Sequence, residues 1–366
     1  MTTRDDRAEL TRREALRLLS AGGGAGLLAS MGVLSVTEGA GASMVRGAVS
    51  AGELAQQGPV IRTVLRDYAP DALPDGAVLF HEHLSIQLGA RPSFHSDVDL
   101  MIAEAQAAAS DGVAAIVDGG HPDMARDIEA LRRIARESGM PIVASGGYYM
   151  QRTYPDDIAT KSANQIADDL VAEAGRDRLG AYGEIGQQGG VLTDDERKVH
   201  QAVAQAHVRT GIPVFTHNAY SIRSPNVPRE AALRQLDIYE AAGANRQNLC
   251  IGHVCCLDDP AADISIALAR RGVYVGFDRV TLNGTMPDAN RVIMAMALIE
   301  AGHADKLLLS SDFYSAPSLK ANGGAGFAQA ATVFGPMLLE AGLDPQTLRM
   351  VLVDNPRRFL TFTPRA

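Results

Sequence analysis

Short, almost uninterrupted apolar runs alternate with helical segments from about residue 57 to the end of the chain. We expect eight of these runs to be strands: Ala77–His83, Gly112–Gly119, Met140–Tyr148, Leu179–Ile185, Ile212–His217, Leu249–His253, Gly272–Asp278 and Lys306–Asp312. Runs that are apolar at successive positions, rather than at every second one, are typical of strands buried on both faces of a parallel sheet.

Between these runs, apolar residues recur at helical spacing, as Ile128, Leu131, Ile134 and Ala135 do on one face of the segment 127–138. The helices that this pattern predicts are Asp127–Ser138, Asp194–Thr210, Arg229–Ala242, Asp259–Arg271, Ala289–Ala301, Ala325–Ala341 and Pro345–Val353. Most of them are followed by a glycine, the residue that commonly ends a helix in the left-handed conformation: Gly211, Gly243, Gly272, Gly302 and Gly342.

Eight strand–helix units predict an α/β fold, a closed (β/α)₈ TIM barrel over residues 58–366, with a short hairpin at Pro59–Tyr68 covering its base. The alternative is an open, doubly wound sheet. No G-x-G-x-x-G motif opens a helix after the first strand, which disfavours a dinucleotide-binding protein of that kind.

The first 42 residues have the order of an export signal. Arg12-Arg13 precedes a weakly apolar, glycine-rich stretch, and Ala40-Gly41-Ala42 fits a cleavage site, with Ser43 as the mature N-terminus. The paired arginines predict a twin-arginine-type signal and hence a periplasmic or extracellular protein. Residues 43–57 are expected to be a leader, and no membrane span is expected to remain after the signal is removed.

Charge and cysteine content exclude some functions. The chain has 34 Lys and Arg against 43 Asp and Glu, a net charge of -9, so nucleic acid is not an expected partner. Three cysteines, Cys250, Cys255 and Cys256, form no disulfide pattern, and we expect them to be small buried residues beside a strand end.

Polar side chains that can bind a divalent metal end several of the predicted strands: His81 and His83 on the first, then Glu184, His217, His253 and Asp312 on the fourth, fifth, sixth and eighth. The strands of a barrel carry its active site at their C-terminal ends, so these side chains are expected to converge. Two metal ions would use all six, with Glu184 as the bridge. Zn²⁺ is the expected metal, and Mn²⁺, Co²⁺ and Fe²⁺ are the alternatives.

The remaining five of the nine histidines are expected to lie elsewhere. His121, after Gly119-Gly120, is a candidate for the wall of a substrate pocket. The others fall in predicted loops or helices, where we expect them to be solvated: His95, His200, His207 and His303.

At these residues the sequence resembles the phosphotriesterase-like family of the amidohydrolase superfamily. The segments that carry the resemblance are Leu79-Phe80-His81-Glu82-His83-Leu84, Gly183-Glu184-Ile185-Gly186, Thr216-His217, Ile251-Gly252-His253, Gly276-Phe277-Asp278-Arg279, Ser311-Asp312 and Asn355-Pro356. The resemblance spans about residues 58–362. It implies two divalent ions, a bridging hydroxide as nucleophile, and Asp312 as the catalytic group that accepts the proton. It also implies a small-molecule substrate and, as a property of the family, a homodimer.

Three positions depart from the pattern of phosphotriesterases proper, and they indicate which branch of the family the sequence resembles. Glu184 stands where many members carry a carbamylated lysine, as in the branch of phosphotriesterase-homology proteins. Cys256 and Arg279 replace the Asp and His of the proton relay in phosphotriesterases proper, which disfavours phosphotriester hydrolysis. Tyr148 and Arg279 match positions that lactonase-like members use around the substrate, so both are candidate substrate-binding residues.

Hydrolysis of a carboxylic ester, above all a lactone, is therefore the leading hypothesis for function. Amide hydrolysis of an N-acyl compound is the second, because the same nucleophile attacks amides. Phosphotriester hydrolysis is the third, and a barrel that binds a ligand without activity is the non-enzymatic alternative.

Overall fold

Eight parallel strands form a nearly closed barrel in the computed structural model, which describes residues 58–89, 93–222, 226–282 and 286–365. Along the chain the strands are β3 (Ala77–Glu82), β4 (Val113–Asp118), β5 (Ile142–Gly146), β6 (Ala181–Ile185), β7 (Val214–Thr216), β8 (Leu249–Ile251), β9 (Tyr274–Phe277) and β10 (Leu307–Leu309). Each pairs with the next, so chain order and spatial order coincide. The predicted barrel is confirmed, and the doubly wound alternative is excluded.

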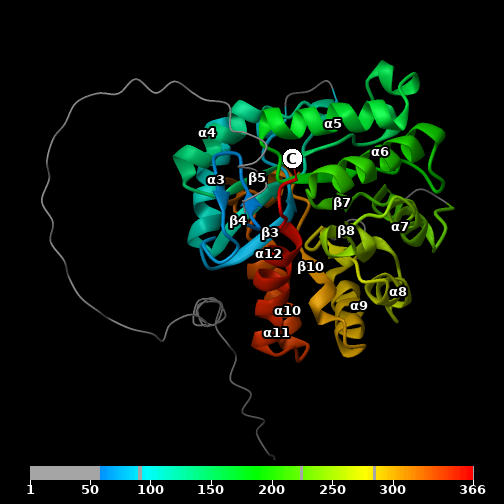
Figure 1. The fold of residues 1–366 in the computed structure, drawn as a ribbon. Helices are drawn as coiled ribbons and strands as arrows, with labels where there is room; N and C mark the ends of the chain where they lie inside the picture. The colour runs from blue at the N-terminus through cyan, green and yellow to red at the C-terminus, as the bar shows by residue number, and fades with distance from the viewer. Residues whose placement is uncertain (1–57, 90–92, 223–225, 283–285, 366) are drawn as a thin grey trace, which may run out of the picture.

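The barrel closes between β3 and β10 without a regular ladder. The Asp312 N–H donates to the His81 carbonyl at 3.1 Å, and the His81 N–H donates to Ser310 Oγ at 3.0 Å. Figure 1 shows these two strands side by side at the centre of the molecule. The seam therefore depends on residues that belong to the predicted metal site.

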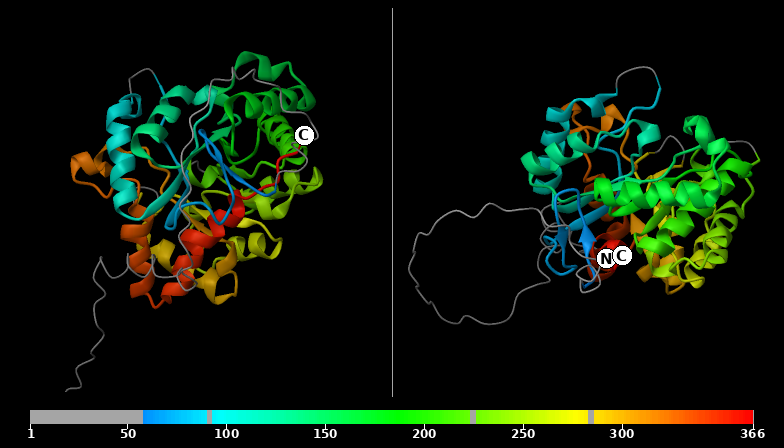
Figure 2. Two further views of the ribbon diagram at one scale, coloured as in Figure 1. Left: turned by 60° about the vertical axis from the view of Figure 1, so that its left-hand side comes forward. Right: turned by 45° about the horizontal axis from the view of Figure 1, so that its top comes forward.

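Helices surround the strands, as Figure 2 shows from two further sides. They are α3 (Val98–Ser110), α4 (Ile128–Ser138), α5 (Ala163–Asp177), α6 (Asp194–Thr210), α7 (Ala231–Ala241), α8 (Asp263–Arg270), α9 (Asp288–Glu300), α10 (Gly335–Glu340), α11 (Pro345–Arg349) and α12 (Asn355–Leu360). Among the described residues, no helix is both long and apolar enough to cross a membrane.

Local sequence signals account for several helix ends. Thr193 caps α6 in a capping box with Glu196, and Gly211 ends it with a φ of 79°. The helix predicted from Ala325 instead begins as α10 at Gly335, after a π-helical turn at Ala330–Phe334. Pro336, which has no N–H to donate, lies at this junction and interrupts the regular bonding pattern.

Aromatic side chains fill the end of the barrel opposite the C-terminal ends of the strands. Phe359 of α12 contacts Phe80 of β3 edge-on, with ring centroids 6.2 Å apart, and also packs against Tyr274. The predicted hairpin is present as β1 (Ile61–Arg62) and β2 (Asp67–Tyr68), and Val60 pairs with Phe362 beside it. With this end filled, the open end of the barrel is the one that carries the predicted site.

The predicted export signal and leader lie outside the described residues, so they stay predictions.

Candidate metal centre

The six predicted ligands come together at the C-terminal ends of the strands. His81, His83, Glu184 and Asp312 form one group of ligand atoms within 4.8 Å of one another, and Glu184, His217 and His253 form a second. All six side chains are buried. Glu184 belongs to both groups, which is the position that a bridging ligand needs.

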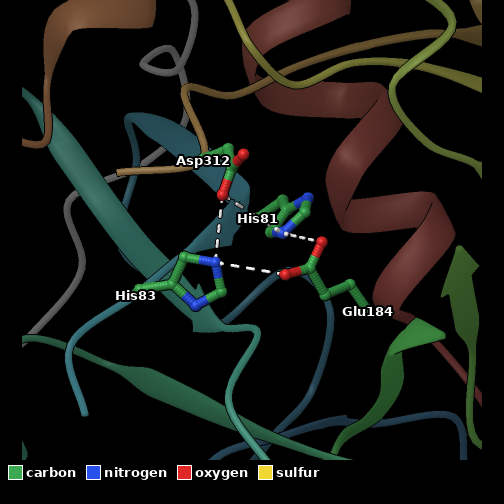
Figure 3. Close-up of side chains that lie close together, drawn as sticks. All are labelled: His81, His83, Glu184 and Asp312. Atoms are coloured by element: carbon green, nitrogen blue, oxygen red, sulfur yellow. Dashed lines mark hydrogen bonds and ion pairs between the residues drawn. The ribbon is translucent and has the colours of Figure 1, made fainter. Parts of the chain in front are cut away.

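Glu184 lies between histidines of different strands. Its Oε2 is 3.3 Å from Nε2 of His81 and 3.3 Å from Nε2 of His253, while its Oε1 is 3.4 Å from Nε2 of His83. Asp312 Oδ1 is 3.0 Å from the same His83 nitrogen. Figure 3 shows the Glu184 carboxylate facing His81 and His83, with Asp312 above them.

The atoms that face the centre of the cluster fit a metal rather than hydrogen bonds. Four buried ligand atoms have no hydrogen-bond partner: Nε2 of His81, Nε2 of His253, Nδ1 of His217 and Oε2 of Glu184. Buried polar atoms of folded proteins are nearly always satisfied, so lone pairs aimed at one point without hydrogen-bond partners indicate a site that fits a cation.

Asp278 fixes the orientation of two of these histidines. Its Oδ2 is 2.9 Å from Nδ1 of His81, and its Oδ1 is 3.0 Å from Nδ1 of His253. A carboxylate that accepts both Nδ1–H groups leaves both Nε2 lone pairs directed at the cluster. Asp278 was predicted only as the last residue of a strand, with no role in the site. Its place next to Arg279, at the end of an apolar run, was the signal available.

The imidazole of His217 presents its other ring nitrogen to the cluster than His81 and His253 do. Its Nε2 meets Ser221 Oγ at 3.0 Å and the Tyr149 hydroxyl at 3.3 Å, so its Nδ1 is the atom left for a metal. Burial and the neighbouring His253 lower the pKa of His217 to about 3, which keeps its imidazole neutral and able to bind a metal.

The carboxylates give the cluster a strongly negative character. Burial opposes ionisation of Glu184, but the positive charge of the nearby His81 imidazole holds the pKa of its carboxyl well below the usual range. Burial would likewise lower the pKa of His253, yet Asp278 and Glu184 raise it to about 9. Ionised carboxylates in a dry site attract cations, so the electrostatics favour the same conclusion as the geometry.

Arg279 stands beside the cluster as predicted. One guanidinium nitrogen is 3.2 Å from Asp312 Oδ2, and the other donates to the Tyr314 hydroxyl at 2.8 Å. Only 8% of the residue is exposed. A planar cation at this place can bind an anionic or carbonyl oxygen of a substrate.

Glu82, between the two histidines of the first strand, holds the segment that carries Asp312. Its carboxylate accepts the Ser310 hydroxyl at 2.7 Å, the Ser311 N–H at 2.9 Å and the Phe313 N–H at 3.0 Å. Asp312 itself has a φ of 48°, an unusual value for a residue other than glycine, and the surrounding bonds hold it there. Sequence reasoning missed Glu82.

Four of the six candidate ligands line a cavity of about 640 Å³, and His81 and His253 lie behind them. The polar part of its lining is His83, Tyr149, Glu184, His217, Ser221, Arg279, Asp312 and Ser315. The rest of the wall is largely apolar and consists of Ile86, Leu88, Met124, Ile222, Leu282 and Tyr314. A polar floor under apolar walls suits a small organic substrate.

Tyr149, rather than the predicted Tyr148, lines this cavity. Tyr148 is half-buried and packs edge-on against Tyr154, with ring centroids 6.1 Å apart. β5 ends at Gly146, and Gly147 has a φ of 131°. This left-handed turn breaks the alternation of the strand, so Tyr149 faces inward in place of Tyr148.

Three of the histidines expected to be solvated are buried, and that expectation was wrong for His95, His200 and His207. His200 lies between the Tyr239 hydroxyl and the Gly186 carbonyl, at 3.0 and 3.2 Å. His207 bonds the carbonyl of Ile212 at 2.6 Å. Both belong to the core-facing side of α6, and their hydrogen bonds offset the loss of water.

The other residues singled out by the sequence lie off the cavity. His121 is buried, with Nδ1 3.3 Å from Asp123 Oδ1, and is not part of the cavity lining. Cys250 and Cys255 are buried free cysteines, as predicted, while Cys256 is only partly buried.

A (β/α)₈ barrel with buried histidines and carboxylates around a cavity at its C-terminal end defines the class: this is a metal-dependent hydrolase. The family follows from comparison. The model described as "Phosphotriesterase family" matches residues 63–360, and the chain belongs to that family.

Relatives and solved structures agree with this assignment. The phosphotriesterase homology protein of Escherichia coli (strain K12) is 32% identical over 299 residues, 78% of this chain and 98% of that protein. The N-acetyltaurine hydrolase of Danio rerio is 27% identical over 354 residues, 82% and 98% of the two chains. The crystal structure of the Escherichia coli protein, with phosphate in its active site, superposes with a TM-score of 0.71 at 29% identity, covering 80% of this chain and all of that one.

A lactonase from Listeria monocytogenes shares the fold, with a TM-score of 0.70 at 22% identity, covering 83% of this chain and 99% of that one.

Proposed function

We propose that this chain hydrolyses the acyl–nitrogen bond of a small N-acyl compound whose amine part carries an anionic group. The observation that carries the proposal is the buried guanidinium of Arg279 on the cavity wall, 3.2 Å from Asp312 Oδ2. A cation so close to the cluster would fix the distance between a substrate anion and the bond that is cleaved. N-acetyltaurine, which gives several relatives their name, is an amide that carries a sulfonate.

Two metal ions fit the donor set. His81, His83 and Asp312 would hold one, His217 and His253 the other, and Glu184 would bridge them. Divalent ions bound there supply a Lewis acid for the carbonyl oxygen and an activated water as nucleophile. Zn²⁺ is the metal we propose, and Mn²⁺, Co²⁺ and Fe²⁺ suit the same imidazole and carboxylate donors.

Three residues of the chain would perform the remaining roles in the reaction. Asp312 accepts the proton of the attacking water and returns it to the amine nitrogen, which cannot leave without it. Arg279 exchanges part of its pairing with Asp312 for the anionic group of the substrate. The Tyr149 hydroxyl, at the cavity wall beside His217, is placed to donate a hydrogen bond to a substrate oxygen.

Ester hydrolysis, with lactones as the main subclass, is the second candidate. The apolar wall that includes Ile86, Met124 and Leu282 favours it, because a lactone with an alkyl chain has no need of an anion partner. Cleavage of an ester also places less demand on proton return, since an alkoxide leaves more readily than an amide anion. Phosphotriester hydrolysis stays a third prediction.

A matched substrate panel tests the proposal on protein loaded with Zn²⁺, Mn²⁺ or Co²⁺, after metal analysis has shown about two ions per chain. The panel contains N-acetyltaurine, an N-acetyl amino acid, a neutral N-acetyl amine, a lactone, an aryl ester and a phosphotriester. We expect the two anionic amides to have the highest kcat/KM, and Arg279→Met to remove most of their advantage over the neutral amide. Faster turnover of the lactone would support the second candidate instead. Metal-loaded protein that hydrolyses nothing on the panel would contradict both.

We also propose that the protein is exported through a twin-arginine-type signal in residues 1–42. The support is the order of paired arginines, apolar stretch and small-residue cleavage site. Mass spectrometry of the secreted or periplasmic protein, with Arg12→Lys/Arg13→Lys as the comparison, tests this. A mature N-terminus at Ser43 that disappears in the variant is expected, and full-length protein retained in the cytoplasm of wild-type cells would contradict export.

A further inference from the structure

A second hollow of about 640 Å³ lies on the outside of the barrel, between α6 and α7. Figure 1 shows these two helices next to each other. The hollow shares no lining residue with the cavity at the candidate metal centre. Helix α6 contributes Arg197, Gln201 and Gln205, which are spaced four residues apart and share one face. The volume falls within the range of small-molecule binding sites.

Two cations border this hollow and face it from different helices, Arg197 from α6 and Arg234 from α7. No hydrogen bond or ion pair joins either guanidinium to another of the described residues. Asp237 of α7 also lines the hollow, but its carboxylate is already paired with Arg271 at 2.6 Å. The hollow therefore has an unbalanced positive character within an acidic protein.

Its floor is preorganised. Gln187 lines the hollow and is only 2% exposed. Its side-chain N–H donates to the Gly189 carbonyl at 2.8 Å, and its Oε1 accepts from Gln235 at 3.0 Å. Because both ends of the amide are held, a ligand would meet a fixed polar surface rather than a side chain that must first be ordered.

The other part of the lining is apolar. Val191, which is 66% exposed, stands at the rim, and Leu192 and Ile238 continue the surface inward beside small alanines. An exposed valine next to a hollow is the kind of surface that an alkyl group covers.

A third hollow, at the opposite end of the barrel from the metal centre, makes a useful contrast. It also contains cations, but they are engaged: Lys306 lies 3.6 Å from Asp305, and Arg357 donates to the carbonyl of Leu73 at 3.1 Å. A cation already bonded has less to gain from an anion, so the hollow between α6 and α7 is the better candidate.

From these observations we propose that the hollow between α6 and α7 is a second binding site, for a small anion that carries a short alkyl chain. The anionic group pairs with Arg197 and Arg234, and the chain covers Val191 and Ile238. The site is separate from the candidate metal centre, and the proposal does not depend on the reaction performed there.

Binding of octanoate to the full-length protein tests the proposal, with octanol as the probe that lacks the charge and inorganic phosphate as the probe that lacks the chain. We expect octanoate to bind more tightly than either. The double variant Arg197→Gln/Arg234→Gln should weaken octanoate binding about tenfold or more, since each guanidinium contributes a charge-assisted hydrogen bond. Isothermal titration calorimetry measures the affinity, and NMR of labelled protein places the perturbed residues.

Two control variants decide between sites. Arg209→Gln removes an arginine from the same helix, where it pairs with Asp168 on the surface, and should leave octanoate binding unchanged. Arg279→Met should also leave octanoate binding unchanged, because Arg279 lines the other cavity.

Loss of octanoate binding in Arg279→Met but not in the double variant would place octanoate at the metal centre and overturn the proposal. No binding by the wild-type protein in the millimolar range would overturn it too, and phosphate binding as tight as that of octanoate would refute the role of the chain.

Discussion

The carboxylate of Glu82 accepts the backbone N–H of Phe313 at 3.0 Å, across the seam where β3 and β10 meet without a regular ladder. The same carboxylate accepts the N–H and the hydroxyl of Ser311, both at 2.9 Å. Asp312, between those two residues, is thus held from both sides in its left-handed conformation. These bonds therefore tie the strand that carries His81 and His83 to the segment that carries Asp312, so they connect three of the candidate metal ligands.

Replacing Glu82 by glutamine should therefore impair the reaction more than the binding of substrate. The amide offers one acceptor oxygen instead of two, so the 310–313 segment loses part of its support and Asp312 shifts. We expect kcat to fall about 100-fold, the order that a displacement near 1 Å can cost, with a smaller change in KM. Steady-state kinetics and metal content of the same preparation measure both effects.

Glu104→Gln is the matched control for that variant. Glu104 is a carboxylate of α3, 2% exposed, that accepts the backbone N–H groups of Lys320 and Ala321 at 3.0 and 2.9 Å. It holds a loop in the same manner, but away from the metal centre. Both variants should lose stability, and only Glu82→Gln should lose kcat. Equal losses of kcat would show that Glu82 acts through general stability alone.

Asp278→Asn should weaken metal binding. Asp278 accepts Nδ1–H groups of His81 and His253, and an asparagine can accept only through one oxygen while its NH₂ group opposes the second histidine. We expect the affinity for the metal to fall about 10- to 100-fold. Competition with a chelator of known affinity measures it, and excess metal should restore part of the activity.

Asp118→Asn serves as the comparison, because Asp118 is equally buried but bonds only backbone N–H groups, those of Leu84 and Ser85 among them. An unchanged metal affinity in Asp278→Asn would mean that the two histidines keep their orientation without it.

The two adjacent tyrosines after β5 should differ in their effect on the reaction. Tyr149→Phe removes a hydroxyl that faces the cavity 3.3 Å from His217, whereas Tyr148→Phe removes one from a side chain packed against Tyr154. We expect kcat/KM to fall about tenfold or more for Tyr149→Phe, in line with the loss of one hydrogen bond to the reacting group, and to change little for Tyr148→Phe. The reverse order, in the same assay, would restore the assignment that the sequence suggested.

The convergence of the six candidate ligands could be predicted from the sequence because their signal is local. Each of His217, His253 and Asp312 is a polar residue at the end of an apolar run, and parallel strands of a barrel bring those ends together. The barrel itself follows from eight such runs separated by helical segments. Neither inference needs a contact between particular distant residues.

Contacts between distant residues could not be predicted in this way. Glu82 meets Ser311 across 229 positions, and Asp278 meets His81 across 197. Nothing in the neighbourhood of either carboxylate reveals its partner. The choice between Tyr148 and Tyr149 failed for another reason, because one positive φ at Gly147 reverses which side chain faces inward.

The burial of His200 and His207, by contrast, was within reach of the sequence. His200, Val203, Ala204 and His207 follow one another at spacings of three, one and three residues, which places them on one face of α6. The two apolar members indicate that this face packs on the barrel. Whether a histidine on a helix is buried therefore has to be predicted from the face of the helix on which it lies, since a helix has both an exposed and a buried side.

His200 makes the stability of the protein depend on pH in a defined direction. Burial lowers the pKa of its imidazole from 6.5 to about 4. Between these two values the unfolded chain binds a proton that the folded chain does not, so the free energy of unfolding decreases as the pH falls through this window. From pH 7 to pH 5 the loss due to this one residue is about 2 kcal/mol.

Urea unfolding at both pH values, at fixed metal loading, should show this loss of stability in the wild-type protein and a smaller loss in His200→Gln. The variant also starts from a lower stability, since it loses the bonds to Tyr239 and Gly186, so the difference between the two pH values is the quantity that matters. His303→Gln, which changes a partly exposed histidine, should keep the wild-type difference. An equal decrease in all three proteins would mean that acid acts elsewhere, on the carboxylates and histidines of the metal centre, rather than on the buried face of α6.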